Sequence, residues 1–309
     1  MLKMYRAIWR VSGPKQILLV VLSIGIAALA AAPLKFQQEI VNLISTGSFA
    51  ISQLLLLGTG MSGVILASLG LKWLMGYLSQ LLGEDVIRRI RNGLVSDAVM
   101  DPASQGARHR GALSTAISAE AEDLGKFAGS AFSEPVMQVG TLISVVGFVA
   151  ATQPGLGVIA FSMILPQIMI VLFTQRKVNA FLAERVRMLR HSTDMIASAD
   201  LQSISQEVTE EFDRIYETRR KMFRWKLSTK FVLSAINGGG TVLVLVLGGW
   251  FVAQGKTDVG TVVAATIGLD RLRDPTMYLI SFYRQVSANR VKFQLLRDML
   301  VHRVESDVG

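Results

Sequence analysis

Four charged residues interrupt the last long apolar run of the chain. They are Asp270, Arg271, Arg273 and Asp274, and Pro275 follows them directly. A charge at membrane depth costs at least ~2.5 kcal/mol and generally faces a protein interior or a wet cavity. The two arginines could therefore bind a polar or anionic group inside a bundle of helices. They could equally pair with the two aspartates, three residues away, and brace their own helix.

Two other features of the apolar runs suggest contact with a ligand. Lys72 stands about ten residues before the end of its run, roughly 15 Å deep at the rise of an α-helix. It could meet a polar ligand in a cavity, or it could snorkel to the interface or pair with a carboxylate. Gly238, Gly239 and Gly240 lie inside another run, where glycines permit close approach of helices. We favour a packing or hinge role for them over contact between exposed backbone and a ligand.

The sequence offers no arrangement for enzyme chemistry, so we expect no catalytic residue and no metal site. The absence of cysteine excludes thiolate ligands and nucleophiles. The three histidines are scattered without ligand spacing, and the carboxylates of 120–123 are spaced around a helix rather than along one face. The stretch 58–63 is rich in glycine but lacks the lysine of a phosphate-binding loop, and no such loop occurs elsewhere.

Apolar and polar blocks alternate along the chain. It is 51% hydrophobic, with 18% charged residues and a mean hydropathy of +0.43, and about 20 apolar residues cross a bilayer. The basic start and the alanines of 30–32 resemble a signal peptide, but the apolar run continues past them and reads as a first span. The sequence thus predicts an all-α polytopic membrane protein with six transmembrane helices, about Ile17–Leu34, Leu54–Leu82, Val136–Ala151, Leu156–Phe173, Phe231–Ala253 and Val259–Phe282.

Basic residues mark one side of the predicted membrane protein. Of the 32 lysines and arginines, 27 lie before the first span, after the last, or in the long segments 83–134 and 175–230. The positive-inside rule places these segments and both termini in the cytoplasm. The net charge of +9 follows the spans rather than forming one patch with aromatics, so no nucleic-acid partner is expected.

Each long cytoplasmic segment has helical periodicity and a break near its middle. The first breaks at Asp101–Gly106, where proline and glycine stop a helix, and the second around Ala199–Ser205. At ~1.5 Å per residue, a 25-residue extension reaches nearly 40 Å beyond the membrane. Each segment is therefore predicted to be two long helices joined at a tip.

This layout resembles the transmembrane domain of an ABC exporter of the type IV fold. Gly83 to Arg91 resembles the stretch after the family's second helix, and Gly111 to Ser118 resembles its Gly-x-Leu…Ile-Ser stretch. Gly260 to Ala264 resembles the start of its sixth helix, with Pro275 as the matching proline. Glu120 departs from the usual aspartate.

The resemblance implies a domain over residues 1–300 and a short tail, 301–309, without a nucleotide-binding domain. ATP and Mg are then expected only on a partner ATPase, either a separate polypeptide or a domain lost by truncation. The other implied partners are membrane lipid and a second transmembrane domain, in a homodimer or heterodimer of the inner membrane. The alternative is a non-transporting sensor or scaffold.

The resemblance also gives roles to residues. It implies that the tips dock the ATPase, through Asp101, Pro102, Ser104, Gln105 and Gly106 in the first tip and Asp200, Leu201, Gln202 and Ser203 in the second. The charged residues Lys72, Arg271, Arg273 and Asp274 are candidates for the translocation path of such a domain, and Gly238, Gly239, Gly240 and Pro275 are candidates for hinges or packing. The substrate cannot be named from the sequence.

Overall fold

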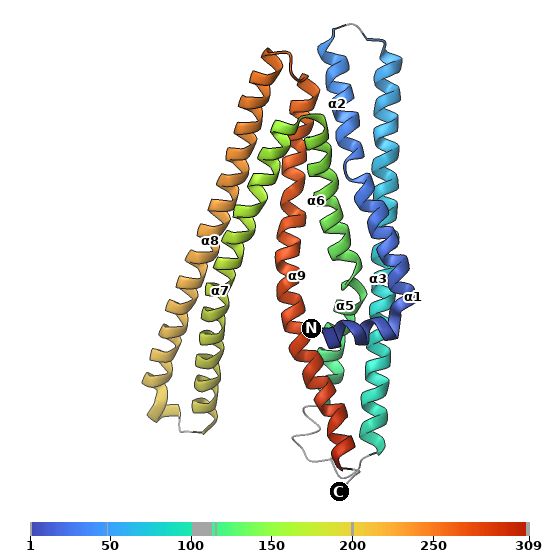
Figure 1. Cartoon of the computed structure of the whole chain (residues 1–309). Helices are drawn as coiled ribbons and strands as arrows, with labels where there is room; N and C mark the ends of the chain where they lie inside the picture. The colour runs from blue at the N-terminus through green and yellow to red at the C-terminus, as the bar shows by residue number, and fades with distance from the viewer. Residues whose placement is uncertain (1, 48, 101–112, 115, 199–200, 307–309) are drawn as a thin grey trace.

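The computed structural model describes residues 2–47, 49–100, 113–114, 116–198 and 201–306. Within these ranges the chain is helical apart from short turns and contains no strand, which confirms the all-α prediction (Figure 1). The elements are α1 (Leu2–Leu29), α2 (Ala32–Ser45), α3 (Ile51–Met100), the π-helix η2 (Ala116–Glu120), α5 (Ala121–Ser130), α6 (Ser133–Thr152), α7 (Pro154–Ser198), α8 (Leu201–Ala253) and α9 (Val259–Ser306).

Five helical segments of the described chain are long and apolar enough to cross a membrane. They are Leu2–Ser45, Ile51–Ser96, Ala116–Thr152, Pro154–Leu189 and Gln206–Ala253. The predicted sixth span lies in α9, which is long enough but carries four charges between Asp270 and Asp274. Figure 1 shows α9 running through the middle of the bundle beside α6 and α2, and it packs against both.

The prediction that 17–34 forms a single helix is wrong. α1 ends at Leu29 and α2 begins at Ala32, so the apolar run 17–34 is divided. Pro33 explains the break, because its ring nitrogen has no hydrogen to donate to the preceding turn. It is accommodated instead in the first turn of α2, where that donor is not needed.

The two ends of the bundle differ. At the turn end, uppermost in Figure 1, α6 and α7 join at Gln153, and Gly255 turns the chain between α8 and α9 with a φ of +67°. At the tip end, α7 stops at Ser198 and α8, which packs against it, starts at Leu201, so the second long segment is two helices as predicted. Of the predicted break, Ala199 and Asp200 lie outside the described residues, and 201–205 is helical. α3 ends at Met100, and the first predicted tip, Asp101–Gly106, lies outside the described residues.

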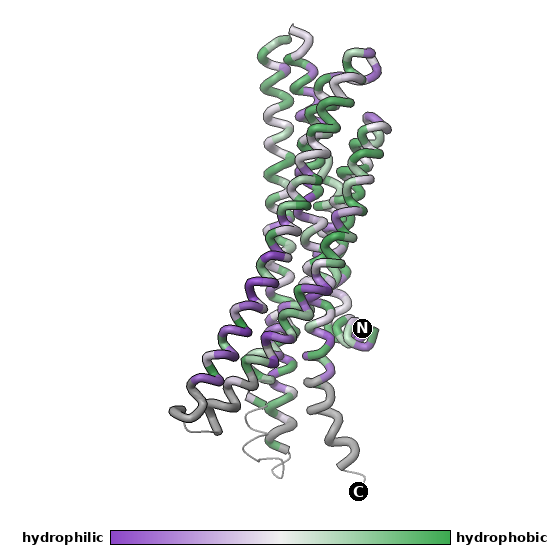
Figure 2. The backbone as a smooth tube through the Cα atoms, turned by 90° about the vertical axis from the view of Figure 1, so that its left-hand side faces the viewer, coloured by the Kyte–Doolittle hydropathy of each residue, from purple (hydrophilic) through white to green (hydrophobic). Residues whose placement is uncertain are grey.

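Three apolar clusters hold the described bundle together. One joins α2, α6, α7, α8 and α9 around Leu34, Val145 and Val244, each fully buried. A second joins the start of α1, α3, α5 and α9 toward the tip end, and a third joins α1, α3 and α6. Figure 2 shows apolar residues dominating the upper half of the bundle and polar residues becoming frequent toward the tip end. This gradient fits an upper half in lipid and a lower half in water.

Candidate functional site

A large cavity opens between the paired helices α7 and α8 on one side and α6 and α9 on the other. Its volume is about 1050 Å³. In Figure 1 the α7–α8 pair leans away from α9 toward the tip end, on the side where this cavity opens. Its walls include apolar side chains from three helices (Leu142, Ile168, Leu172, Leu279 and Ile280) and basic side chains from three helices (Arg176, Arg185, Lys226 and Arg284). We call it the basic cavity.

The charge of the basic cavity is one-sided. Among the described residues that line it there is no aspartate or glutamate. In the described part of the chain, none of its four cations lies within 4.0 Å of a carboxylate oxygen. The Nε atom of Arg185 is buried and has no hydrogen-bond partner. The cavity therefore offers uncompensated positive charge and at least one unused donor.

Polar contacts fix α7 against α8, so one wall of the basic cavity is a firm unit. The side-chain amide of Gln167 donates to Asn237 Oδ1 at 2.9 Å. The hydroxyls of Thr174 and Thr229 are 2.7 Å apart. Hydrogen bonds between polar side chains of neighbouring helices stabilise such pairs within a membrane.

Arg271 contacts backbone rather than an aspartate. Its Nη1 donates to the carbonyl oxygen of Ala30 at 3.3 Å, and the side chain is half-buried. That carbonyl lies at the break between α1 and α2, where carbonyls lose their helical partners and a cation is favourable. Arg273 and Asp274 are exposed, and no ion pair joins them to each other, to Arg271 or to Asp270 within the described chain. The predicted bracing by i,i+3 pairs is absent here.

The predicted path residues do not gather at one place. Arg271 lies against the α1–α2 break, whereas Lys72 is exposed on α3, where its charge interacts with that of Glu134. None of Lys72, Arg271, Arg273 and Asp274 lines the basic cavity, and their role in a path stays a prediction. Sequence reasoning counted the cavity's basic residues only as markers of topology. The available signal was a set of basic residues on α7, α8 and α9 in the polar segments next to the predicted spans.

The glycine triplet has mixed surroundings. Gly240 is buried, and a side chain there would collide with Met163 of α7. Gly238 and Gly239 have open space around the position of a Cβ atom. Pro275 is buried within α9, which continues through it.

Of the predicted docking residues, only part of the second tip is described. Leu201, Gln202 and Ser203 form the first turn of α8. Asp200 and the first-tip residues Asp101, Pro102, Ser104, Gln105 and Gly106 lie outside the described residues. Their role in docking stays a prediction.

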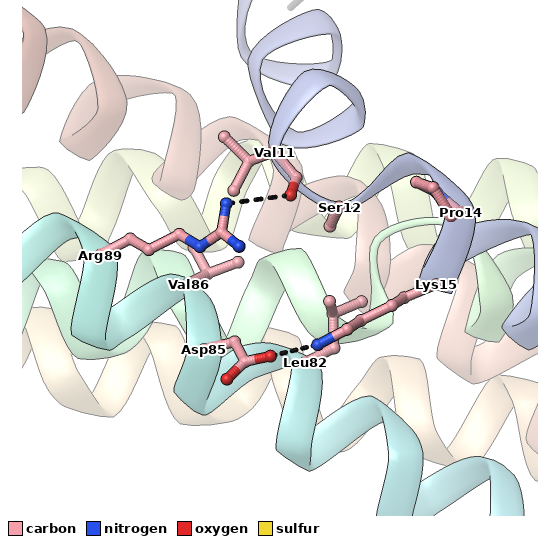
Figure 3. A pocket seen from close by; sticks show the side chains of 8 residues that line it. All are labelled: Val11, Ser12, Pro14, Lys15, Leu82, Asp85, Val86 and Arg89. Carbon is pink, nitrogen blue, oxygen red and sulfur yellow. Dashed lines mark hydrogen bonds and ion pairs between the residues drawn. The ribbon is translucent and has the colours of Figure 1, made fainter.

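The start of α1 is fastened to α3 by two contacts around a small cavity of about 230 Å³. Figure 3 shows Lys15 of α1 paired with Asp85 of α3, and the Arg89 guanidinium directed at the carbonyl oxygen of Val11. The latter hydrogen bond, from Arg89 Nη1, is 3.4 Å long. Pro14 lies at the wall of the same cavity, next to the bend of α1. These contacts set the angle between the first turns of α1 and the bundle.

A second set of contacts near the tip end links α5 to α9 and α3 to η2, and an ion pair forms within α5. Lys292 of α9 pairs with Asp123 of α5. Arg91 of α3 donates to the carbonyl of Ile117 at 2.9 Å, and Lys126 pairs with Glu122 at 2.5 Å. π-Helical turns such as η2 are frequent at functional sites.

Hydrogen bonds also fasten α2 to the start of α9 at the turn end. Gln38 Nε2 donates to Thr261 Oγ1 at 2.7 Å, and the Gly260 N–H donates to Asn42 Oδ1 at 2.7 Å. Asp258 accepts from the Thr261 N–H at 2.7 Å. Partial burial raises the pKa of Asp258, but the hydrogen bonds from Thr261 and Asn42 outweigh it and leave that pKa below its usual value.

A bundle of long apolar helices with polar extensions and an internal basic cavity defines a multi-pass membrane protein. The family model described as ABC transporter transmembrane region matches residues 16–269, and no ATP-binding domain is matched. The chain therefore belongs to the ABC transporter transmembrane region family. A search of curated proteins finds no match.

Proposed function

We propose that this chain is the membrane component of an ATP-driven transporter and works as one of two paired transmembrane domains. The family match supports a permease role. ATP and Mg are bound by ATP-binding domains supplied in trans, and the tips receive their movement. The protein lies in the inner membrane with both termini and the tip end in the cytoplasm, as the charge bias of the sequence favours.

The observation that carries this proposal is the length of the helices beyond their apolar parts. α8 starts at Leu201, whereas its predicted span starts at Phe231. These thirty residues reach roughly 45 Å at the α-helical rise. A rigid pair of that length turns a small displacement at the tip into a displacement of α7 and α8 relative to α9, and so changes the basic cavity between them.

The proposed mechanism is alternating access. Closure of the ATP-binding domains draws the tips together, and the α7–α8 pair moves as a unit because its polar contacts hold it. Gly238 and Gly239, which have open space around the position of a Cβ atom, are the proposed hinge positions, with Pro275 in α9. Lys72, Arg271, Arg273 and Asp274 remain proposed contacts along the path.

The test is co-purification from native membranes in mild detergent, followed by measurement of ATP hydrolysis in the purified complex. An ATP-binding polypeptide is expected to accompany the chain and to hydrolyse ATP faster with it than without it. Asp101→Lys and Asp200→Lys should each lower this stimulation several-fold, whereas Lys256→Glu at the turn end should not. If no ATPase accompanies the chain and the tip variants behave as wild type, transport is excluded and the sensor or scaffold alternative stands.

A further inference from the structure

The upper end of the basic cavity is apolar on α7, and its lower part mixes basic and apolar side chains. On α7, Ile168 and Leu172 lie above Arg176 and Arg185, with Val178 and Leu182 between the two arginines. From Ile168 to Arg185 the helix rises roughly 25 Å. On α9, Leu279 and Ile280 lie above Arg284, and Ala288 and Val291 lie below it.

A role in membrane topology does not account for all of these basic residues. A cation that only marks the cytoplasmic side extends into water or toward lipid headgroups. Arg185 is instead only partly exposed and has a buried Nε atom without an acceptor. Burying a donor without a partner costs about 1–3 kcal/mol, a cost that an acceptor bound in the cavity would remove.

The lining also selects the sign and type of the ligand. Three of the four cations are arginines, whose planar guanidinium groups pair in a bidentate manner with carboxylate or phosphate. A cationic or zwitterionic guest would find no carboxylate to pair with among the described lining residues. The volume of about 1050 Å³ lies just above the range of ~300–1,000 Å³ that small-molecule sites occupy.

We propose that the basic cavity binds an anionic amphiphile, with its phosphate or carboxylate group at Arg185 and Arg284 and its apolar tail against Ile168, Leu172 and Ile280. This inference rests on the proposed function, because it takes the cavity as part of the translocation path and the amphiphile as the class of substrate. The anionic group can belong to a bilayer lipid or to a soluble amphiphile.

The test is binding to the purified full chain in nonionic detergent, measured by native mass spectrometry. Dodecyl phosphate is expected to bind one molecule per chain. Dodecyltrimethylammonium, with the same tail and the opposite charge, should bind at least about tenfold more weakly, since loss of a charge-assisted hydrogen bond is worth roughly that factor. Inorganic phosphate, which lacks the tail, should compete poorly.

The variants address the lining directly. The double variant Arg185→Gln/Arg284→Gln should weaken dodecyl phosphate binding by at least about tenfold, and Arg185→Lys/Arg284→Lys should recover part of it. The charge-matched control Lys221→Gln/Arg224→Gln changes exposed residues of α8 that do not line the cavity, and should bind as wild type. Circular dichroism of each variant verifies that the helices are intact.

Three results would overturn the inference. These are equal binding of the anionic and cationic probes, full competition by inorganic phosphate, or equal loss in the cavity variant and the control. Competition by phosphatidylglycerol but not by phosphatidylcholine would identify a bilayer lipid as the source of the anionic group. If neither lipid competes, the source is a soluble amphiphile. Both results support binding of an anionic amphiphile. Because the assay contains no ATPase, its failure is distinct from failure of the coupling experiment.

Discussion

The tight approach of α6 and α7 at Gly157 predicts a measurable packing cost. Gly157 is buried just after the turn that joins these helices. A Cβ atom there would lie 2.5 Å from both Cα and Cβ of Ala150 and 3.0 Å from its backbone nitrogen. Carbon atoms pack best at about 3.5–4.0 Å, so Gly157→Ala would overlap by about 1 Å with backbone that cannot rotate away.

The magnitude follows from comparison with a glycine on the same helix pair. At Gly147 of α6 nothing lies within 4 Å of a Cβ position, so Gly147→Ala meets no obstacle. Both substitutions gain similar helix propensity, up to about 1 kcal/mol. The difference between them isolates the overlap at Gly157, and overpacking of this kind typically costs about 1–3 kcal/mol. Gly157→Ala should therefore be less stable than Gly147→Ala by that amount.

The assay is unfolding of the purified chain by sodium dodecyl sulfate, followed by circular dichroism. The second variant, Gly157→Ala/Ala150→Gly, removes one of the two carbon atoms in conflict and should recover part of the loss. Equal free energies of unfolding for Gly157→Ala and Gly147→Ala would show that α6 and α7 are not in close contact here. So would a double variant that is no more stable than Gly157→Ala.

Three further predictions concern single contacts. Because the pKa of Asp258 is lowered in the folded protein, the stabilising effect of its carboxylate is present above the ordinary pKa of 3.8 and disappears as the pH falls through the lower folded pKa. In Asp258→Asn, the melting temperature should therefore decrease less as the pH is lowered through this range. Arg271→Gln should lower the free energy of unfolding by about 1 kcal/mol, because the hydrogen bond to the carbonyl oxygen of Ala30 is lost. Arg273→Gln should not, because Arg273 is exposed and unpaired in the described chain. Equal effects of the two substitutions would show that Arg271 does not stabilise the α1–α2 break. Lys15→Glu should lower the melting temperature slightly and make it sensitive to salt. The swapped pair Lys15→Glu/Asp85→Lys should restore the melting temperature. If it does not, the ion pair between Lys15 and Asp85 does not hold α1 against α3.

The sequence predicted the elements well wherever local pattern decides them. The turns at Gln153 and Gly255 were placed correctly, because proline, glycine and polarity act on their own neighbours. The division of the second long segment into two helices was also predicted. The division of the first span was missed, although Pro33 was the local cause. The hydropathy of 17–34 is continuous through the break, and it outweighed the proline in the interpretation.

The candidate site was less predictable. The charges of Asp270 to Asp274 drew attention because they interrupt an apolar run, yet Arg271 contacts a backbone carbonyl of the α1–α2 break, and the other three charged residues are exposed. The basic cavity was not foreseen. Its cations lie in the polar segments next to the spans, where basic residues are common, so their positions in the sequence do not indicate a binding site.

The sequence by itself determined that the chain is helical, spans a membrane repeatedly and has a basic polar side, because hydropathy and charge act residue by residue against lipid and water. Only the tertiary structure decided which of the many basic residues share a space. Arg176 and Arg284 lie far apart in the chain and face one cavity only because α7 and α8 are held together and lean away from α9. That arrangement depends on packing between distant helices, which no local pattern encodes.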